Sequence, residues 1–534
     1  MKDIVVLRVL PFVITLHLAV FGLSQVNSFQ PLALQSQLRT RTKTVHVQTT
    51  TTVITTLKKV NVNRLELTLK STIQDNSGQL DAKEIDNEYE YENLTQPTSS
   101  ALSMNLDELS HELHGRGKAQ LSWDCFRIGI DPIHFHNPAF PEEELDNALR
   151  GLLDHNDNRN PLLCTTTRKD IQQHLSSRRE SQTMGSKALK ALSQYCYPSS
   201  LGIESSIATL SEITRSNDGT TKLLLKLVNT DFYIESVIIP NPGWGKSTLC
   251  ISSQVGCAQG CVFCATGKMG RLASLTPDQI LVQLYYANKV CRVINSSKSN
   301  SNSSNSNGNG DCDGDGTPGS DKSQNLPQID NVVFMGMGDA ADNIESVKKA
   351  VDVMTDRSCF ALAPSKITIS TVGPSPDVFD KLAQADAVLA WSVHAVRDDL
   401  RKKLVPSTKY TMVELRDGVV HALTNRSKRM RALMLEIALM DGLNDGVQEA
   451  EELADFCVDL TSRVEGMKLM VNLIPFNDIG YEQYRRPSDA NLAAFQKVLV
   501  EKGVKTYVRT TRGDDESAAC GQLATKKRKK QQKD

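Results

Sequence analysis

Three closely spaced cysteines are the residues of this chain best suited to chemistry. Cys257, Cys261 and Cys264 follow one another at x3 and x2 spacing, in a loop that contains Gly256 and Gly260. Such thiolates can surround one iron–sulfur cubane, but an electron-transfer cluster normally takes four cysteines. The trio therefore predicts a 4Fe-4S cluster with one iron open to another molecule. Zinc is the less favoured alternative, because structural zinc sites prefer two separated pairs of ligands.

A β/α rhythm indicates how this loop is positioned. Apolar, β-branched runs recur six times, with helix-length amphipathic stretches such as 347–356 and 447–460 between them. The expected strands cover 249–253, 331–337, 366–372, 387–394, 432–440 and 469–476. This alternation predicts an α/β fold with a parallel sheet, curled into a partial β/α (TIM-like) barrel or left open. Active residues are then expected at the carboxyl ends of the strands. A hairpin is expected before them, with strands 208–213 and 222–227.

The rest of the chain is predicted to form appendages to one catalytic domain. The catalytic domain is expected over 205–525, with a disordered insertion rich in Ser, Asn and Gly over 295–328. The other expected parts are a targeting segment at 1–70, an acidic disordered linker at 71–105, a small helical domain at 106–204 that could bind RNA, and a basic tail at 526–534.

The N-terminal composition indicates targeting. Residues 4–23 form an apolar run interrupted by Arg8 and His17, which is typical of a signal peptide. No Asp or Glu occurs from Ile4 through Leu65, where basic residues stand among many Thr and Gln, as in a transit peptide. The two together resemble a bipartite plastid presequence, with cytoplasm or mitochondrion as the alternative. A membrane span is not expected in the mature protein, because the polar interruptions would be costly in a spanning helix.

The charge balance limits where RNA could bind. A formal net charge of −1 gives no global attraction for nucleic acid, so any RNA-binding surface must be local. Basic residues that could line an RNA path, or equally form an ordinary solvated face, are Arg401, Lys402, Lys403, Arg426, Lys428, Arg429, Arg485 and Arg486.

Several strings along the chain resemble one enzyme family. The sequence LCISSQVGCAQGCVFC at 249–264 is similar to the radical S-adenosylmethionine (SAM) signature, and more narrowly to the RlmN/Cfr-type RNA adenine methyltransferases. Further similar strings follow in order: GMGD at 336–339, ST at 370–371, SVHA at 392–395, NLIPFN at 472–477 and RGDDESAACGQL at 512–523. The resemblance covers about residues 208 to 524. Over 106–204, where the family carries a small helical RNA-recognition domain, the match is poor.

The resemblance implies a set of cofactors and contacts. It implies one 4Fe-4S cluster held by Cys257, Cys261 and Cys264, two SAM molecules per turnover, and a low-potential electron donor such as ferredoxin or flavodoxin. A monomer is expected. The residues implied to bind SAM are Gly338, Asp339, Ser370, Ser392, Val393, His394 and Asn477. The family usually has Glu-Pro after Gly-Met-Gly, whereas Asp339-Ala340 stand here, so the acidic side chain is one methylene shorter.

The resemblance also implies a mechanism that uses two further cysteines. The first SAM methylates Cys520, and a radical made from the second SAM removes hydrogen from that methyl group. The carbon then adds to an adenine ring. Glu235 is the implied acceptor of the ring proton, and Cys250 releases the product by forming a Cys250–Cys520 disulfide.

The implied product is an adenosine methylated at C2 in ribosomal RNA. Transfer RNA is a further expected substrate. Methylation at C8, a radical SAM paralogue acting on another substrate, and a non-catalytic cluster or zinc module that binds RNA are the alternatives.

Overall fold

The protein is described by a computed structural model, which covers residues 4–10, 13–19, 100–142, 145–154, 167–172, 175, 183–196, 206–299, 326–480 and 483–523. The chain divides into two units, Met1–Glu90 and Tyr91–Asp534. In the first unit, the described residues are β1 (Ile4–Leu10) and β2 (Val13–Ala19), which pair as an antiparallel hairpin. The remaining targeting segment, the predicted linker up to residue 99 and the basic tail at 526–534 lie outside the described residues.

The described residues in the N-terminal part of the second unit are mostly helical. Its helices are α3 (Leu106–Glu112), α4 (Arg116–Arg127), α5 (Pro132–His136), α6 (Asn147–Asp154), α7 (Arg168–Gln172) and α8 (Ser186–Cys196). Helix α3 begins with a capping box, in which Asn105 accepts from the Glu108 amide and the Glu108 carboxylate accepts from the Asn105 amide.

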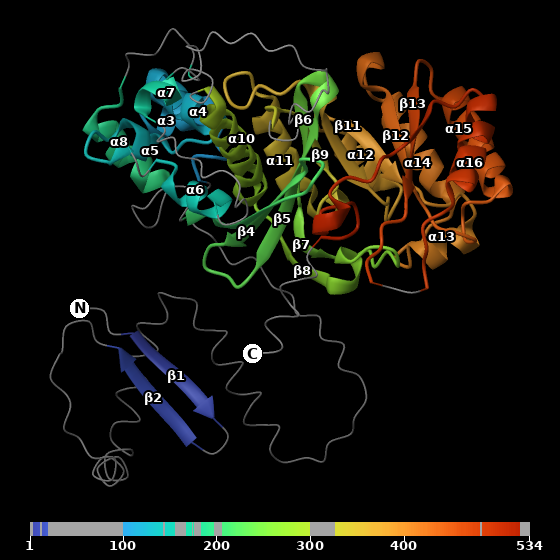
Figure 1. Ribbon diagram of the computed structural model, residues 1–534, viewed down its shortest axis with the longest axis horizontal. Helices are drawn as coiled ribbons and strands as arrows, with labels where there is room; N and C mark the ends of the chain where they lie inside the picture. Colours follow the sequence, from blue (N-terminus) through green and yellow to red (C-terminus); the bar gives the residue numbers. More distant parts are fainter. Residues whose placement is uncertain are drawn as a thin grey trace, which may run out of the picture. The chain divides into compact units, whose positions relative to one another are not determined.

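These helices pack directly on the catalytic part. Arg292 of α10 (Pro277–Ser299) donates two hydrogen bonds of 2.8 and 2.9 Å to the buried Asp146 carboxylate. One hydrophobic core runs from Leu102 and Trp123 through to the strands of the sheet. The helical region and the sheet therefore share a core, and Figure 1 shows the helices against α10.

A ten-stranded mixed sheet forms the centre of the second unit (Figure 1). Its antiparallel part contains β3 (Ala208–Arg215), β4 (Thr221–Leu227), β5 (Tyr233–Asn241) and β6 (Lys246–Cys250). Its parallel part continues from β6 through β9 (Ile329–Phe334), β10 (Ile367–Thr371), β11 (Val388–Ser392), β12 (Ala432–Leu439), β13 (Lys468–Pro475) and β14 (Thr506–Val508). The strand order is linear, with β3 and β14 at its ends. This confirms the predicted α/β fold.

Helices connect successive parallel strands. They are α11 (Ile344–Thr355), α12 (Asp377–Ala383), α13 (Asp398–Leu404), α14 (Met412–Thr424), α15 (Val447–Arg463) and α16 (Asp489–Glu501). In α15, Ala450, Leu453, Ala454, Cys457 and Leu460 recur at helical spacing and are all buried. None of the described helices is long and apolar enough to cross a membrane.

The predicted insertion at 295–328 differs from the structure at both ends. Helix α10 continues to Ser299, so the first five residues of the insertion are helical. The Asn295 side chain then bonds both the amide and the carbonyl of Leu326, which is buried. These bonds bring the chain back to the point where it left the fold, and residues 300–325 lie outside the described residues.

Candidate active site

The cysteine loop connects β7 (Gln254–Cys257) to β8 (Gly270–Ser274), and these two strands pair as an antiparallel ribbon. Gly256 has a φ of 74°, and a Cβ there would lie 1.9 Å from the Gly270 carbonyl oxygen, so the close approach of the two strands requires glycine. The loop is fixed to α13, because the Val262 amide donates to the Leu404 carbonyl at 3.1 Å. Cys257 stands at the end of β7, a short strand that lies beyond the strand predicted over 249–253.

The three thiols line one cavity, with Cys257 and Cys261 buried and Cys264 half-buried. Burial raises the pKa of Cys257 to about 12. Burial also raises the pKa of Cys261 well above its usual range, and the neighbouring Cys264 and Cys257 raise it further. Three thiolates can gather here only beside a compensating positive charge, and this suits a cationic cluster.

The arrangement differs from that of a mononuclear metal site. Within the described parts of the chain, no three His, Cys, Asp or Glu side chains converge closely enough to hold a single ion. A cubane cluster binds its three thiolates through three different irons, so it takes ligands that are further apart than those around one zinc ion. The donor types and the shared cavity therefore fit a cluster.

The same cavity, about 150 Å³ in volume, collects most of the residues predicted to bind SAM. Those that line it are Gly338, Asp339, Ser370, Ser392, His394 and Asn477, together with Cys520. Most of them follow or end parallel strands, so they gather at the carboxyl edge of the sheet. Val393, Cys250 and Glu235 are not among its lining residues. The buried Val393 instead donates its amide to the Glu436 carbonyl at 3.1 Å.

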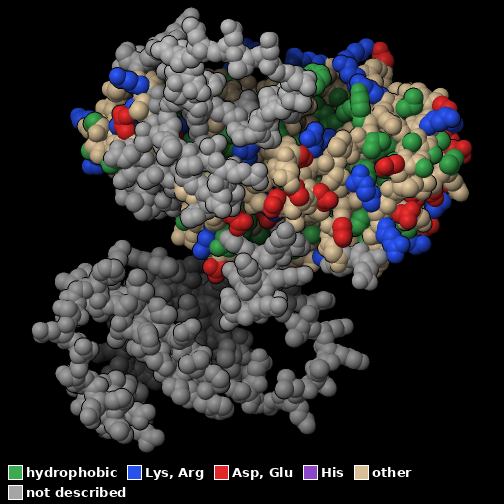
Figure 2. Space-filling model, in the orientation of Figure 1, with side chains coloured by type: hydrophobic (Ala, Val, Ile, Leu, Met, Phe, Trp, Pro, Cys, Tyr) green, Lys and Arg blue, Asp and Glu red, His purple; other side chains and the backbone are tan. Residues whose placement is uncertain are grey.

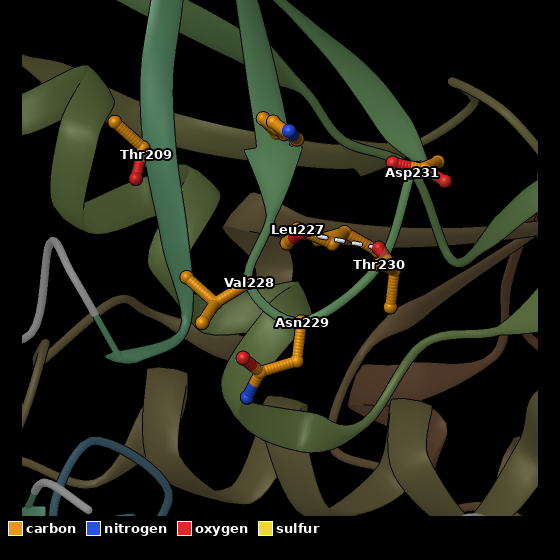
Figure 3. A pocket seen from close by; sticks show the side chains of 7 residues that line it. Thr209, Leu227, Val228, Asn229, Thr230 and Asp231 are labelled. Atoms are coloured by element: carbon orange, nitrogen blue, oxygen red, sulfur yellow. Dashed lines mark hydrogen bonds between the residues drawn. The ribbon is translucent and has the colours of Figure 1, made fainter. Parts of the chain in front are cut away.

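A larger hollow lies elsewhere, at the turn between β4 and β5. Its volume is about 460 Å³, and Thr209, Lys226 and residues 227–231 line it. Figure 3 shows Thr230 bonded to the Leu227 carbonyl, a contact of 3.1 Å that closes this turn on itself. None of the predicted site residues lies there. Cavity volume alone therefore does not identify the candidate active site.

Asp339 is buried at the start of η6 (Ala340–Asn343), and its carboxylate already accepts backbone hydrogen bonds. Oδ1 accepts from the Ala341 amide at 2.9 Å, and Oδ2 accepts from the Val372 amide at 2.8 Å. Burial raises the pKa of Asp339 to about 6 despite these bonds. The Thr371 side chain also donates to this carboxylate, and at least one lone pair of the two oxygens remains for the predicted contact with an ammonium group.

Three other residues predicted to contact SAM, Ser370, Ser392 and His394, form hydrogen bonds within the protein. Ser370 and Ser392 lie on neighbouring strands, with their hydroxyls 3.2 Å apart. His394 adopts a φ of 59°, and its Nδ1 accepts from the Ala438 amide at 3.1 Å. Burial, followed by the positive charge of Arg401, lowers the pKa of His394 to about 3, so the ring is neutral at physiological pH.

Asn477 holds the C-terminal segment. Its Nδ2 donates to the Cys520 carbonyl at 3.1 Å, and its Oδ1 accepts from the Thr511 hydroxyl at 3.0 Å. The next residue, Gly521, accepts from the Ala265 amide of the cysteine loop at 2.8 Å. Cys520 is thus fixed between the loop after β13 and the cysteine loop. Burial, followed by the nearby Cys264, raises the pKa of the Cys520 thiol to about 11, although its side chain is accessible from the cavity.

The C-terminal segment also crosses from β14 back to the β3–β4 turn. The Asp515 carboxylate accepts from the Ser216 hydroxyl and, at 3.0 Å, from the Asn217 amide. Lys222 donates to the Glu516 carbonyl at 2.9 Å, and Asp218 accepts from the Gly513 amide at 3.3 Å. These bonds join the two ends of the sheet, with the red C-terminal turn beside the green strands in Figure 1. We call this set of contacts the C-terminal latch.

Cys250 ends β6 and lies near Cys520. Burial raises the pKa of Cys250 to about 12, and a negative charge on Cys520 contributes to this rise, whereas Arg509 opposes it. Val237 of β5 is the direct partner of Cys250, so the two side chains share one face of the sheet. Glu235 lies two residues before Val237 and therefore points to that face as well. Both cysteines are free thiols.

The sequence analysis missed Glu436 and assigned Arg401 a different role. Glu436 is buried on β12, lines the cavity and accepts from the Asn472 amide at 2.7 Å, and burial raises its pKa to about 7. A single acidic residue within the apolar run 432–440 was the signal that could have identified it. Arg401 is fully buried and donates to the carbonyls of Ser392, Val393 and Val372.

The burial of Arg401 corrects its interpretation as part of a solvated RNA path. Arg426 likewise donates to the carbonyls of Ala385 and Ala387, and Lys428 pairs with Glu465 at 2.7 Å. All three basic side chains bond to other groups of the protein, so they do not form a free basic surface.

Known proteins are similar to this chain in sequence. The chain is 35% identical over 310 residues to the dual-specificity RNA methyltransferase RlmN of Marinomonas sp. (strain MWYL1), covering 58% of this chain and 74% of that protein. It is 37% identical over 311 residues to the protein of the same name from Stenotrophomonas maltophilia (strain K279a), covering 58% of this chain and 70% of that protein.

One solved structure is similar over most of the chain. It is a radical SAM methyltransferase from Sphaerobacter thermophilus, with a TM-score of 0.54 and 26% identity, covering 80% of this chain and 99% of that one. No family model matches the sequence. With the cysteine loop, the sheet and the cavity in agreement, the chain belongs to the RlmN family of radical SAM methyltransferases.

Proposed function

We propose that this protein methylates C2 of an adenosine in ribosomal RNA, with transfer RNA as a second substrate. The observation that carries the proposal is the position of Cys520, which lines the same cavity as Cys257, Cys261 and Cys264 and lies near Cys250. The relatives named dual-specificity RNA methyltransferases support the choice of substrate. Radical chemistry suits it, because the electron-poor C2 carbon of adenine cannot attack a methyl group as a nitrogen would.

The cofactors belong to the proposal. Cys257, Cys261 and Cys264 would hold one 4Fe-4S cluster, and the cavity walls formed by Gly338, Ser370 and neighbouring residues would hold SAM. When bound, these groups supply the one-electron chemistry that activates the methyl group carried by Cys520. A Cβ on Gly338 would lie 2.5 Å from the Gln254 side chain, so glycine keeps this wall close to the cysteine ribbon.

Cys520 and Cys250, the two cysteines outside the trio, have separate roles in the proposed reaction. Cys520 accepts a methyl group on its sulfur, which requires the thiolate, and Arg509 opposes the rise in its pKa. After carbon–carbon bond formation, the ring adduct would carry one unpaired electron. Glu235 would take the ring proton, and the electron would pass to the iron–sulfur cluster held by the cysteine trio, so that the ring regains a closed shell. The Cys250 sulfur then bonds to the Cys520 sulfur as the carbon–sulfur bond breaks, and the released electron pair stays with the product carbon, which takes up a proton. The enzyme is left with a Cys250–Cys520 disulfide that must be reduced.

Isotope-labelled methyl groups test the assignment of Cys520. The reconstituted protein is incubated with methyl-labelled SAM and a reductant, and its peptides are analysed by mass spectrometry. We expect label on Cys520, and none in Cys520→Ala. Cys457→Ala is the matched control, because Cys457 is buried on α15 outside the cavity. Persistence of protein-bound label in Cys520→Ala would overturn the proposal.

The position of the methyl group on the base is tested separately. Mass spectrometry of nucleosides from RNA incubated with the enzyme distinguishes 2-methyladenosine, which we expect, from 8-methyladenosine.

Partners and location complete the proposal. We propose a monomer that receives electrons from ferredoxin or flavodoxin in a plastid. The acid-free composition of residues 4–65 supports plastid import. A fluorescent fusion to residues 1–70 should accumulate in plastids, and an equal distribution through the cytoplasm would contradict the assignment.

A further inference from the structure

The edge strand β14 carries an alternating pattern on one face. Lys505, Tyr507 and Arg509 stand two residues apart, so their side chains point the same way. Tyr507 is level with Asn472 of β13 in the parallel register, and Asn472 points to Glu436 inside the curved sheet. The three side chains therefore belong to the inner face of the sheet, the face that carries the reaction cavity.

A second cavity lies on this inner face, toward the amino ends of the strands. It has a volume of about 400 Å³, and Lys468, Lys505 and Arg509 line it together with Met335 and Glu436. The last two residues also line the cavity that contains Cys520. The two cavities therefore adjoin, and we call the second one the lower cavity. A molecule held in the lower cavity would contact Met335 and Glu436, two side chains that also border the cavity of Cys520.

The cations of the lower cavity are available for a ligand. Lys468, Lys505 and Arg509 are exposed, and none of them forms an ion pair with any residue that the structure describes. Lys505 lies 5.6 Å from the centre of the Tyr507 ring, whose residue is 47% exposed. Elsewhere, basic and acidic side chains are interspersed over the face shown in Figure 2. Three unpaired cations beside an open aromatic ring and an internal cavity stand apart from that background.

We propose that the lower cavity and the inner face of β14 bind a single-stranded segment of the RNA substrate and lead the target nucleotide to Cys520. This inference rests on the proposed function and names the subsite. The cations would contact phosphates, and an RNA base would stack on Tyr507, as in sequence-tolerant binding of single strands. The volume is within the range of a small-ligand site, which suits one extruded nucleotide rather than a duplex.

Stacking on Tyr507 is tested by two substitutions at one position. The full-length protein is titrated with a fluorescein-labelled RNA hairpin that contains an unpaired adenosine, and Kd, KM and kcat are measured. Tyr507→Ala should raise Kd and KM about ten- to a hundredfold, while Tyr507→Phe, which retains the ring, should stay close to the parent protein. Equal binding by Tyr507→Ala and the parent protein would overturn the inference.

The phosphate contacts are tested by charge reversal. Lys468→Glu/Lys505→Glu should weaken binding of the hairpin and lower the dependence of log Kd on log salt by about one to two units. The matched control, Lys497→Glu/Lys502→Glu, reverses two exposed lysines on the outer helix α16 and its cap. It should bind RNA as the parent protein does. A control that loses as much affinity would show a nonspecific charge effect and would overturn the inference.

Methylation of Cys520 in the absence of RNA separates the possible failures. The Tyr507 and lysine variants should still incorporate the methyl label, and this also shows that they fold. If the parent protein takes up no label, the proposed function fails. If the parent and all variants methylate RNA with the same KM, the proposed function stands and the subsite is wrong.

Discussion

The side-chain amide of Asn477 donates a hydrogen bond of 3.1 Å to the backbone carbonyl of Cys520. This bond ties the C-terminal cysteine to the loop that follows β13, at the carboxyl edge of the sheet. The resemblance to RlmN/Cfr-type enzymes implies that Asn477 contacts SAM. The structure adds a second role, because the same side chain positions the residue that would receive the methyl group.

Removing this bond should slow methylation more than it destabilises the fold. Asn477→Ala is expected to cost about 1 kcal/mol of unfolding free energy. It should slow labelling of Cys520 about tenfold or more, because the sulfur would lose its fixed position. Thr511→Val, which removes the bond to Asn477 Oδ1 and the bond that the hydroxyl accepts from Arg486, should act in the same direction and more weakly. Full recovery of the Asn477→Ala rate at high SAM concentration would instead assign the residue to SAM binding alone.

The C-terminal latch should control the mobility of the segment that carries Cys520. Asp515→Ala removes the bonds from Ser216 and Asn217 and should accelerate amide hydrogen exchange across residues 513–521. Glu516→Ala is the neighbouring control, because the latch uses the Glu516 carbonyl and not its carboxylate. Unchanged exchange in Asp515→Ala would show that Asn477 and Ala265 hold the segment without the latch.

Glu436 should make stability depend on pH in a specific direction. Burial raises its pKa from 4.5 to about 7, so the folded protein holds this proton more tightly than the unfolded chain does. The resulting stabilisation is fully present below pH 4.5 and is lost as pH rises through 7. Glu436→Gln stays neutral and should therefore unfold at a higher temperature than the parent protein at pH 8. The difference should shrink toward pH 5. Parallel melting curves for the two proteins across this range would contradict the prediction.

Arg401 should be indispensable for the fold rather than for RNA binding. Arg401→Met leaves the carbonyls of Ser392, Val393 and Val372 without these donors, which should cost about 3 to 5 kcal/mol in urea unfolding. Lysine should rescue little of this loss, because a single ammonium group lacks the fork geometry of guanidinium. Its exposed neighbour offers a control, and Lys402→Met should change stability by less than about 0.5 kcal/mol.

The periodic parts of the fold could be predicted from the sequence. Strand β12 occupies 432–439 where 432–440 is expected, and helix α15 begins at the predicted Val447. The first expected strand was less accurate, because β6 ends at Cys250 while the prediction runs over 249–253. Residues 251–253 leave the sheet toward β7, and an apolar sequence does not show where pairing stops.

Contacts that depend on tertiary structure could not be predicted. The cysteine spacing and the C-terminal string indicated Cys520 as a site residue, and the structure places it in the same cavity as the cysteine trio. The role of Asn477 in holding Cys520 joins segments 43 residues apart and has no local signal. The burial of Arg401 was also hidden, because it precedes Lys402 and Lys403, which are exposed. Charge in sequence does not reveal which of three adjacent cations turns inward.

The central claim is that two cysteines outside the cluster carry and release the methyl group, and one variant tests it directly. Cys250→Ala can still load Cys520 and join it to the base, but it lacks the thiol that breaks the link. Denaturing electrophoresis after incubation with radiolabelled RNA should therefore show RNA covalently attached to the Cys250→Ala protein, and no adduct in Cys250→Ala/Cys520→Ala. Free methylated RNA formed at the parent rate by Cys250→Ala would contradict the account.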